Sequence, residues 1–249
     1  MLPALRTATL ALVLAGAALP AVAQTRIEAL GLSLTATPTL ATDYLFRGIS
    51  QTRNRPAVQG TLEALHDSGF YLGAFVSNLG FAGTNARQEV DALAGYRFTL
   101  GGINWDIGAI YYSYPGYSRP NPAAYNLDYI EGAVRANREF GPVTVSAAVN
   151  VSPNFFGQSG TGVYLESGLD VKLPLDFTAS GRLAYQWIQR EPRFGTPDYL
   201  WYSIGIAREI PGGIVLGLGY YGTDIERRNC SGGQKICDER VLFTISRKF

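Results

Sequence analysis

Apolar and polar side chains alternate along most of the chain after residue 31, in segments separated by turn sequences. In the segment 163–172, Val163, Leu165 and Leu169 share one face of an extended chain, while Glu166 and Asp170 share the other. A period of two predicts β-strands with one apolar and one polar face, and we find no convincing helical period beyond residue 23. Counting the segments gives about twelve strands.

The breaks between segments are of two kinds. Tight turn sequences such as 66–69 and 140–142 alternate with longer polar connections such as 80–87 and 152–161. Short turns on one side and long loops on the other are typical of an outer-membrane barrel with an even number of strands. Aromatic residues also gather near the strand ends, as membrane belts would require. On the long-loop side the expected belt is Tyr44, Phe46, Tyr111, Tyr112, Tyr114, Trp187, Tyr202 and Tyr220.

The last segment predicts how the sheet closes. Val241, Phe243, Ile245 and Phe249 lie on one face of a strand, which would be an aggregation-prone edge if it stayed unpaired. Pairing with the first strand removes that edge. We therefore expect an all-β fold, a transmembrane antiparallel β-barrel of about 12 strands. A soluble barrel or sandwich would alternate in the same way, but it gives no reason for aromatic belts.

The first 23 residues read as a cleaved signal peptide, with Arg6, an apolar run, and a small-x-small site at Ala21–Ala23. A retained amphipathic segment is the rival interpretation. We expect one barrel domain over residues 24–249, exported to the bacterial outer membrane. A hydrophobic content of 47% and a mean hydropathy of +0.03 are too polar for a helical membrane protein. The net charge of +1 gives no reason to expect a nucleic-acid partner.

The two cysteines, Cys230 and Cys237, lie in a polar, glycine-containing stretch near the end of the chain. In an exported protein one disulfide closing a small loop is the simplest interpretation, with free thiols as the alternative. Neighbouring Cys or His partners that a metal site would need are missing from the sequence, so we expect neither a metal nor a cofactor.

The polar face of the predicted strands carries ionisable residues of both signs. Basic residues facing lipid at the membrane midplane would cost about 2–4 kcal/mol each, so these groups should face the lumen. The expected pore-lining residues are Asp43, Arg47, Glu63, Glu89, Asp91, Arg97, Glu131, Arg135, Glu166, Asp170, Lys172 and Arg182. They could line an aqueous path that sorts solutes by charge. Alternatively, they could pair across the barrel and plug it.

Arg47 also has two interpretations. It could form a constriction or contact a ligand at the mouth of the first long loop. It could instead pair with Glu63 on the next strand while Gly48 allows the chain to turn, which is the interpretation we favour.

The segment 42–51 also resembles the opening signature of the TorF-type porin family of proteobacteria, and it reads TDYLFRGISQ. Shorter segments resemble the same family in order, and these are 68–71, 77–78, 94–96, 112–116, 128–131 and 164–166. The resemblance implies an outer-membrane β-barrel of porin type, and with the mixed lumen charges it favours an open or partly open lumen. The cysteine pair is not part of the family pattern.

We therefore expect a passive channel for small hydrophilic solutes. The alternative is a non-conducting barrel that is structural or adhesive through its extracellular loops. No catalytic residues are expected, because His66 falls in a turn and Glu89 and Asp91 fit lumen lining. Expected partners are outer-membrane lipid, lipopolysaccharide near the loop arginines, and the barrel assembly machinery, which generally reads a terminal strand ending in Phe.

Overall fold

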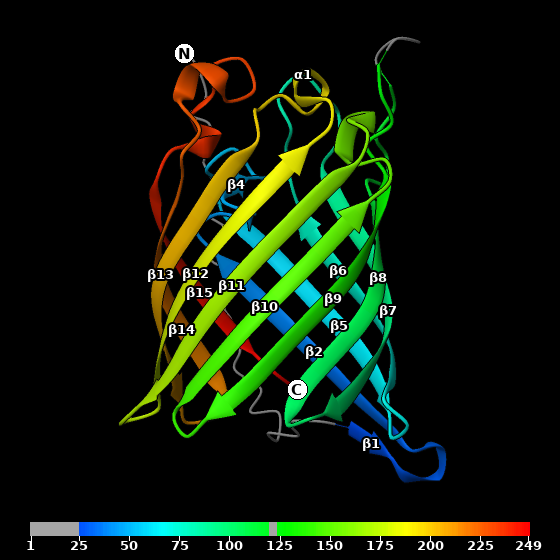
Figure 1. Cartoon of the computed structure of the whole chain (residues 1–249), viewed down its shortest axis with the longest axis vertical. Coiled ribbons are helices and arrows are strands. Elements are labelled where there is room, and N and C mark those ends of the chain that lie inside the picture. The colour runs from blue at the N-terminus through cyan, green and yellow to red at the C-terminus, as the bar shows by residue number, and fades with distance from the viewer. Residues whose placement is uncertain (1–24, 120–123) are drawn as a thin grey trace, which may run out of the picture.

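The structure, a computed structural model, describes residues 25–119 and 124–249, so the predicted signal peptide lies outside the described residues. Twelve antiparallel strands close into a barrel (Figure 1). They are β2 (Leu32–Ala41), β5 (Ala57–His66), β6 (Phe70–Asn78), β7 (Gln88–Leu100), β8 (Ile103–Ser113), β9 (Tyr129–Phe140), β10 (Val143–Ser152), β11 (Gly162–Leu173), β12 (Phe177–Ile188), β13 (Tyr199–Ile210), β14 (Ile214–Thr223) and β15 (Arg240–Arg247). The expected fold class and strand number are confirmed.

The barrel closes where β15 pairs with β2, as the final segment predicted. Beyond the end of β15, Phe249 and Ala36 exchange two backbone hydrogen bonds of 2.8 and 3.0 Å. Pro38 lies between this pair and Leu40, at a position whose amide would point toward β15, and it has no N–H to donate. The closing ladder therefore lacks one rung near its middle.

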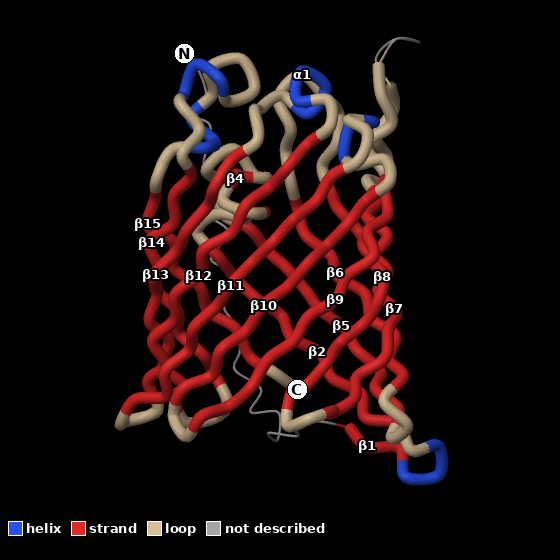
Figure 2. The backbone as a smooth tube through the Cα atoms, in the orientation of Figure 1, coloured by secondary structure: helices blue, strands red, loops and turns tan. Residues whose placement is uncertain are grey.

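Consecutive strands are joined by short turns at one end of the barrel and by long loops at the other (Figure 2). The short strand β1 (Thr25–Ile27) and the 3-10 turn η1 (Glu28–Leu30) precede β2 at the short-turn end. The long loops contain η2 (Phe156–Gln158), the one-turn helix α1 (Glu191–Phe194), η3 (Arg227–Asn229) and η4 (Lys235–Cys237). Among the described residues, none of the helices is long and apolar enough to cross a membrane.

The outer face of the barrel is an apolar surface. Leu72, Ile204 and Val241 are each more than 60% exposed there, as are other outward-facing aliphatic side chains. Outward aromatics lie near both strand ends, including Trp187 and Tyr202 on the long-loop side. An exposed apolar surface around a closed barrel is the arrangement that a bilayer accommodates.

Part of the expected long-loop belt is instead inside the barrel. Tyr44, Tyr112 and Tyr114 are less than 10% exposed, and Phe46 packs against Tyr112 with ring centroids 5.6 Å apart. Their assignment to the outer belt was wrong, because Tyr112 is on the buried face of β8 and the other three lie beyond the barrel strands. These rings belong to a core inside the long-loop half of the barrel.

Candidate functional site: an inward hairpin across the lumen

The chain between β2 and β5 folds into the barrel rather than forming an outer loop (Figure 2). The strands β3 (Leu45–Phe46) and β4 (Ile49–Ser50) form a hairpin with a two-residue turn at Arg47 and Gly48. We call residues 44–51 the inward hairpin, since a hydrogen bond of 2.7 Å from the Gln51 amide to the Tyr44 carbonyl extends its ladder.

The turn requires glycine at its second position. Arg47 and Gly48 have φ of 49° and 82°, and positive φ at both central residues favours tight hairpins of this length. A Cβ atom added to Gly48 would lie 2.7 Å from Cγ2 of Thr223 and 2.9 Å from Cβ of Trp201. The tip therefore packs against the wall formed by β13 and β14.

Arg47 extends from this tip toward β12, the neighbour of β13, and toward β9. Its Nη2 donates to Oε2 of Glu131 on β9 at 2.5 Å, and its Nη1 donates to Oε1 of Gln186 on β12 at 2.6 Å. Its guanidinium carbon also lies 4.1 Å from the ring centroid of Tyr164 and 4.7 Å from that of Phe46. The expected pairing of Arg47 with Glu63 was wrong, because the hairpin carries Arg47 away from β5.

The ion pair between Arg47 and Glu131 is buried, with side chains 6% and 1% exposed. Oε2 of Glu131 also accepts from Tyr112 at 3.2 Å and from Asn150 at 3.1 Å. Within residues 25–119 and 124–249, Oε1 of Glu131 has no hydrogen-bond partner. The ion pair joins the hairpin to β9, and removing either member would leave the other as an unpaired buried charge.

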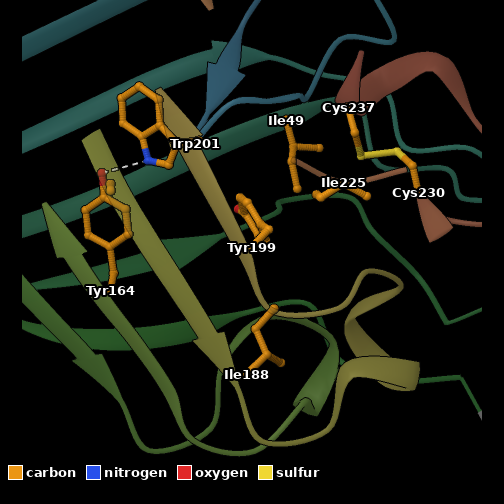
Figure 3. Packing of buried hydrophobic residues seen from close by; sticks show 9 residues of the cluster. Ile49, Tyr164, Ile188, Tyr199, Trp201, Ile225, Cys230 and Cys237 are labelled. Carbon is orange, nitrogen blue, oxygen red and sulfur yellow. Dashed lines mark hydrogen bonds between the residues drawn. A yellow bond between two sulfur atoms is a disulfide. The ribbon is translucent and has the colours of Figure 1, made fainter. Parts of the chain in front are cut away.

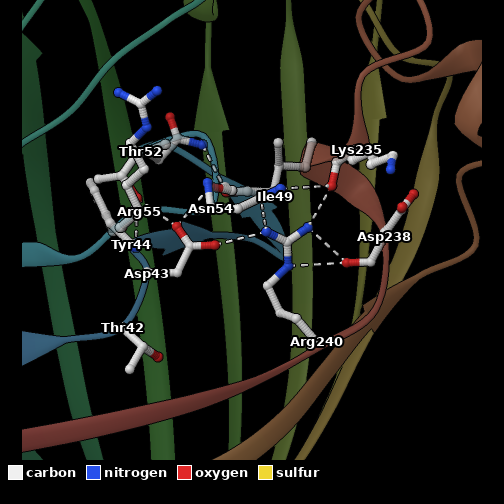
Figure 4. A network of polar contacts seen from close by, with 12 residues as sticks. Thr42, Asp43, Tyr44, Ile49, Thr52, Asn54, Arg55, Lys235, Asp238 and Arg240 are labelled. Atoms are coloured by element: carbon white, nitrogen blue, oxygen red, sulfur yellow. Dashed lines mark hydrogen bonds and ion pairs between the residues drawn. The ribbon is translucent and has the colours of Figure 1, made fainter.

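The two ends of the inward hairpin are fixed to the last part of the chain. Oδ2 of Asp43 accepts from Nη1 of Arg240 at 2.7 Å, and its Oδ1 accepts from the Ser50 and Thr52 hydroxyls at 2.7 and 2.6 Å. Arg240 also donates to Asn54 and to the carbonyls of Lys235 and Asp238 (Figure 4).

The predicted disulfide between Cys230 and Cys237 is present and buried. Together with Ile49 of the hairpin and Ile225, it forms part of one apolar cluster that extends to Tyr199 and Trp201 (Figure 3). In the same cluster, Nε1 of Trp201 donates to the Tyr164 hydroxyl at 3.0 Å. The last long loop therefore covers the hairpin from the outside.

Tyr44 connects the start of the hairpin to β7. Its hydroxyl donates to Oε1 of Glu89 at 2.8 Å, and its ring packs against Phe75 with centroids 5.7 Å apart. Burial, and then the nearby Glu89 carboxyl, raise the pKa of the Tyr44 hydroxyl well above its usual value. Tyr44 therefore remains a hydrogen-bond donor at neutral pH.

On the short-turn side of Arg47 the inner face is more accessible, and we call this part the lower lumen. Glu63 pairs with Arg97 at 2.6 Å, and Arg97 also contacts Asp106 at 3.2 Å. Asp170 pairs with Arg182 at 2.8 Å. These side chains are between 20% and 38% exposed, so they border space that water can enter.

The other expected lumen residues also lie at inward positions of their strands. Arg135 is opposite Asp106 in the register, and Glu166 is hydrogen-bonded to Tyr164. Lys172 lies at the short-turn rim, where it is 66% exposed and 3.8 Å from Glu139. The alternation thus identified the inward face correctly, while the role of these groups in conduction remains a prediction.

Sequence reasoning missed the neutral part of this site. Gln186 and Asn150 hold Arg47 and Glu131 in place, and Phe155 packs beside them. Gln186 does share the polar face of its strand with Arg182, so the alternation contained this signal.

A small cavity opens above the hairpin at the long-loop end, with a volume of about 80 Å³. Its walls come from the hairpin and five long loops, and its described lining has no charged side chain. The lining residues are Phe46, Ile49, Ser50, Gln51, Phe81, Tyr114, Tyr129, Phe155, Phe156, Phe194, Thr196, Ser231 and Ile236. A solute arriving from the loop side would meet aromatic rings first and Arg47 beneath them.

Residues 28–249 match the profile of a family described as bacterial protein of unknown function (Gcw_chp). The chain belongs to this Gcw_chp family. The finer resemblance to TorF-type porins remains a prediction. No curated protein sequence matches the chain.

Solved porin structures share the fold of this Gcw_chp chain at very low sequence identity. The KdgM porin matches with a TM-score of 0.56 and 9% identity, over 86% of this chain and 98% of its own. The NanC porin matches with a TM-score of 0.55 and 8% identity, over 87% and 98%. The KdgM porin in complex with disordered oligogalacturonate matches with a TM-score of 0.54 and 8% identity, over 87% and 97%. Neither the family nor these folds indicates a catalytic activity.

Proposed function

We propose that this protein is an outer-membrane channel for passive diffusion of small hydrophilic solutes, narrowed at Arg47 by the inward hairpin. The observation that carries the proposal is a closed twelve-stranded barrel with an apolar outside and partly exposed ion pairs along the lower lumen. Charged groups at membrane depth must either be hydrated or form ion pairs, and both are possible on the wall of an aqueous lumen.

The fold likeness to the KdgM and NanC porins supports a channel, and one of those structures is described as a complex with oligogalacturonate. A cleaved signal peptide over residues 1–23 would deliver the chain to the outer membrane, where the barrel assembly machinery would insert it. Loop arginines such as Arg53 and Arg190 would then face lipopolysaccharide phosphates.

A second function is a non-conducting barrel that acts through its loops. It is favoured by the burial of Arg47, Glu131 and Gln186, each less than 10% exposed where the hairpin crosses the lumen. In this structure Arg47, Glu131 and Gln186 are in contact with one another at that level, which narrows the lumen.

Conductance of the refolded protein in a planar bilayer under a salt gradient tests the proposal. We expect discrete current steps and a reversal potential. A silent bilayer from a demonstrably folded barrel would reject the channel. Deleting Glu226–Cys237 separates the two functions, because a channel keeps conducting while an adhesin loses its binding surface.

A further inference from the structure

Two carboxyl groups beside the inward hairpin lack a cationic partner among the described residues. Glu89 and Asp91 lie two positions apart on β7, so both side chains point into the barrel. They are 2% and 5% exposed, and they are successive residues on the same buried face of one strand. In the part of the chain that the structure describes, Oδ1 of Asp91 has no hydrogen-bond partner.

The groups packed around this pair do not neutralise it. On β6, Ser77 is opposite Glu89 and Phe75 is opposite Asp91, and neither titrates. The titratable neighbours are Tyr44 from the hairpin, Tyr112 on β8, Tyr114 after β8, and Glu131 on β9. The cation of this region, Arg47, donates to Glu131 and Gln186 instead.

Two adjacent buried carboxylates cannot both be ionised at low cost, so the pair must hold a proton while the hairpin covers it. We infer that a proton shared by Glu89 and Asp91 keeps the inward hairpin closed, and that losing this proton to water releases the hairpin from β7. The release of the hairpin from β7 does not depend on the proposed function. Only the further step, that this release opens a channel, rests on it.

The contact that would be lost is the hydrogen bond from Tyr44 to Glu89. When both carboxyl groups are ionised, each needs water around it, and water can reach them only if the Tyr44 side chain and the residues beside it move away. The closed state therefore binds one more proton than the open state. A rise in pH then lowers the ratio of closed to open molecules by up to about tenfold per pH unit.

Trp201 can report the position of the hairpin without any current. It is 9% exposed, and its Cβ lies against the hairpin tip at Gly48. In a Trp105→Phe/Trp187→Phe background Trp201 is the sole tryptophan of the chain. Acrylamide quenching of its fluorescence is measured on the refolded protein from mildly acidic to mildly alkaline pH. We expect quenching to increase several-fold as the pH rises.

Three variants in that background test the role of the pair. Glu89→Gln/Asp91→Asn carries neutral side chains of the same size, so quenching should stay low at every pH. Tyr44→Phe removes the hydrogen bond to Glu89 and should raise quenching at acidic pH. Asp67→Asn changes an exposed carboxyl in the turn after β5, far from the hairpin, and should keep the parental response. A response that is absent in the parent, or that persists in the double variant, would overturn the inference.

Conductance measured over the same pH range separates this inference from the proposed function. If quenching responds to pH while the bilayer stays silent, the proton-held hairpin stands and the channel is rejected. If current flows equally at every pH and quenching is constant, the channel stands and the proton-held hairpin is rejected.

Discussion

At the scale of single residues, Arg47 and Gly48 have separate tasks in one turn. Arg47 supplies the charge that joins β9 and β12 to the hairpin, whereas Gly48 supplies the space that lets the tip meet Trp201 and Thr223. Neither task is visible from local sequence, because the partners lie between 84 and 175 positions away in the chain.

Replacing Arg47 by alanine should lower the free energy of unfolding by about 3–5 kcal/mol, because Glu131 is left buried without its partner. Denaturant titration of the refolded protein measures this. Arg47→Ala/Glu131→Gln should recover part of the loss, and Arg55→Ala, at an exposed loop position, should cost little. A loss of stability with unchanged ion selectivity would assign Arg47 a purely structural role.

Gly48 has a matched control in Gly116, since both have φ of 82°. Gly116→Ala should cost about 1–2 kcal/mol for the backbone conformation alone, because nothing lies within 4 Å of the added atom. Gly48→Ala should cost about 1–3 kcal/mol more, because the added atom overlaps Thr223 and Trp201. Equal losses of stability in the two variants would show that the tip has room to shift.

At the scale of elements, the strands followed from the sequence, whereas the inward hairpin did not. Leu40, Tyr44 and Phe46 keep a period of two beyond the end of β2 at Ala41, so the pattern continues although the strand stops. Thr42 and Asp43 redirect the chain through contacts with the distant Phe243 and Arg240. A turn fixed by partners about 200 positions away leaves no local signal.

The disulfide between Cys230 and Cys237 should stabilise the loop that covers the hairpin. Cys230→Ser/Cys237→Ser should lower the free energy of unfolding by about 2–3 kcal/mol, since the unfolded chain regains the freedom that the bridge removes. Reduction of the wild type should have the same effect, and a reductant should leave the double variant unchanged. A reductant that weakens both proteins equally would point to a cause other than the bridge.

At the scale of the whole molecule, alternation and turn spacing were enough to predict a closed barrel with twelve strands, because each strand carries its own signal. The interior of the barrel, in contrast, is determined by contacts between side chains that are far apart in the sequence. The segments 42–51, 112–116, 128–131 and 164–166, which carry the porin resemblance, supply Arg47, Tyr112, Glu131 and Tyr164 to one cluster. These segments carried the resemblance without indicating a site, and their meeting in space could not be predicted from the sequence.

The inner face carries more acidic than basic groups between its rims, with eight carboxyl and five guanidinium groups on the described residues. They are Asp43, Glu63, Glu89, Asp91, Asp106, Glu131, Glu166 and Asp170, against Arg47, Arg97, Arg135, Arg182 and Arg240. A conducting lumen should therefore prefer cations, and the reversal potential in a potassium chloride gradient measures this preference. Asp170→Asn should weaken the preference, whereas an anion preference in the wild type would contradict the charge assignment.

The clasp between Asp43 and Arg240 joins residues 197 positions apart, so it can form only when the final strand is in place. Until then the base of the hairpin is held only by contacts that do not involve the final strand, such as those from Ser50 and Thr52 to Asp43. A chain truncated before Arg240 would therefore lack the clasp at the base of the hairpin, whereas Arg47 would keep its partners on β9 and β12.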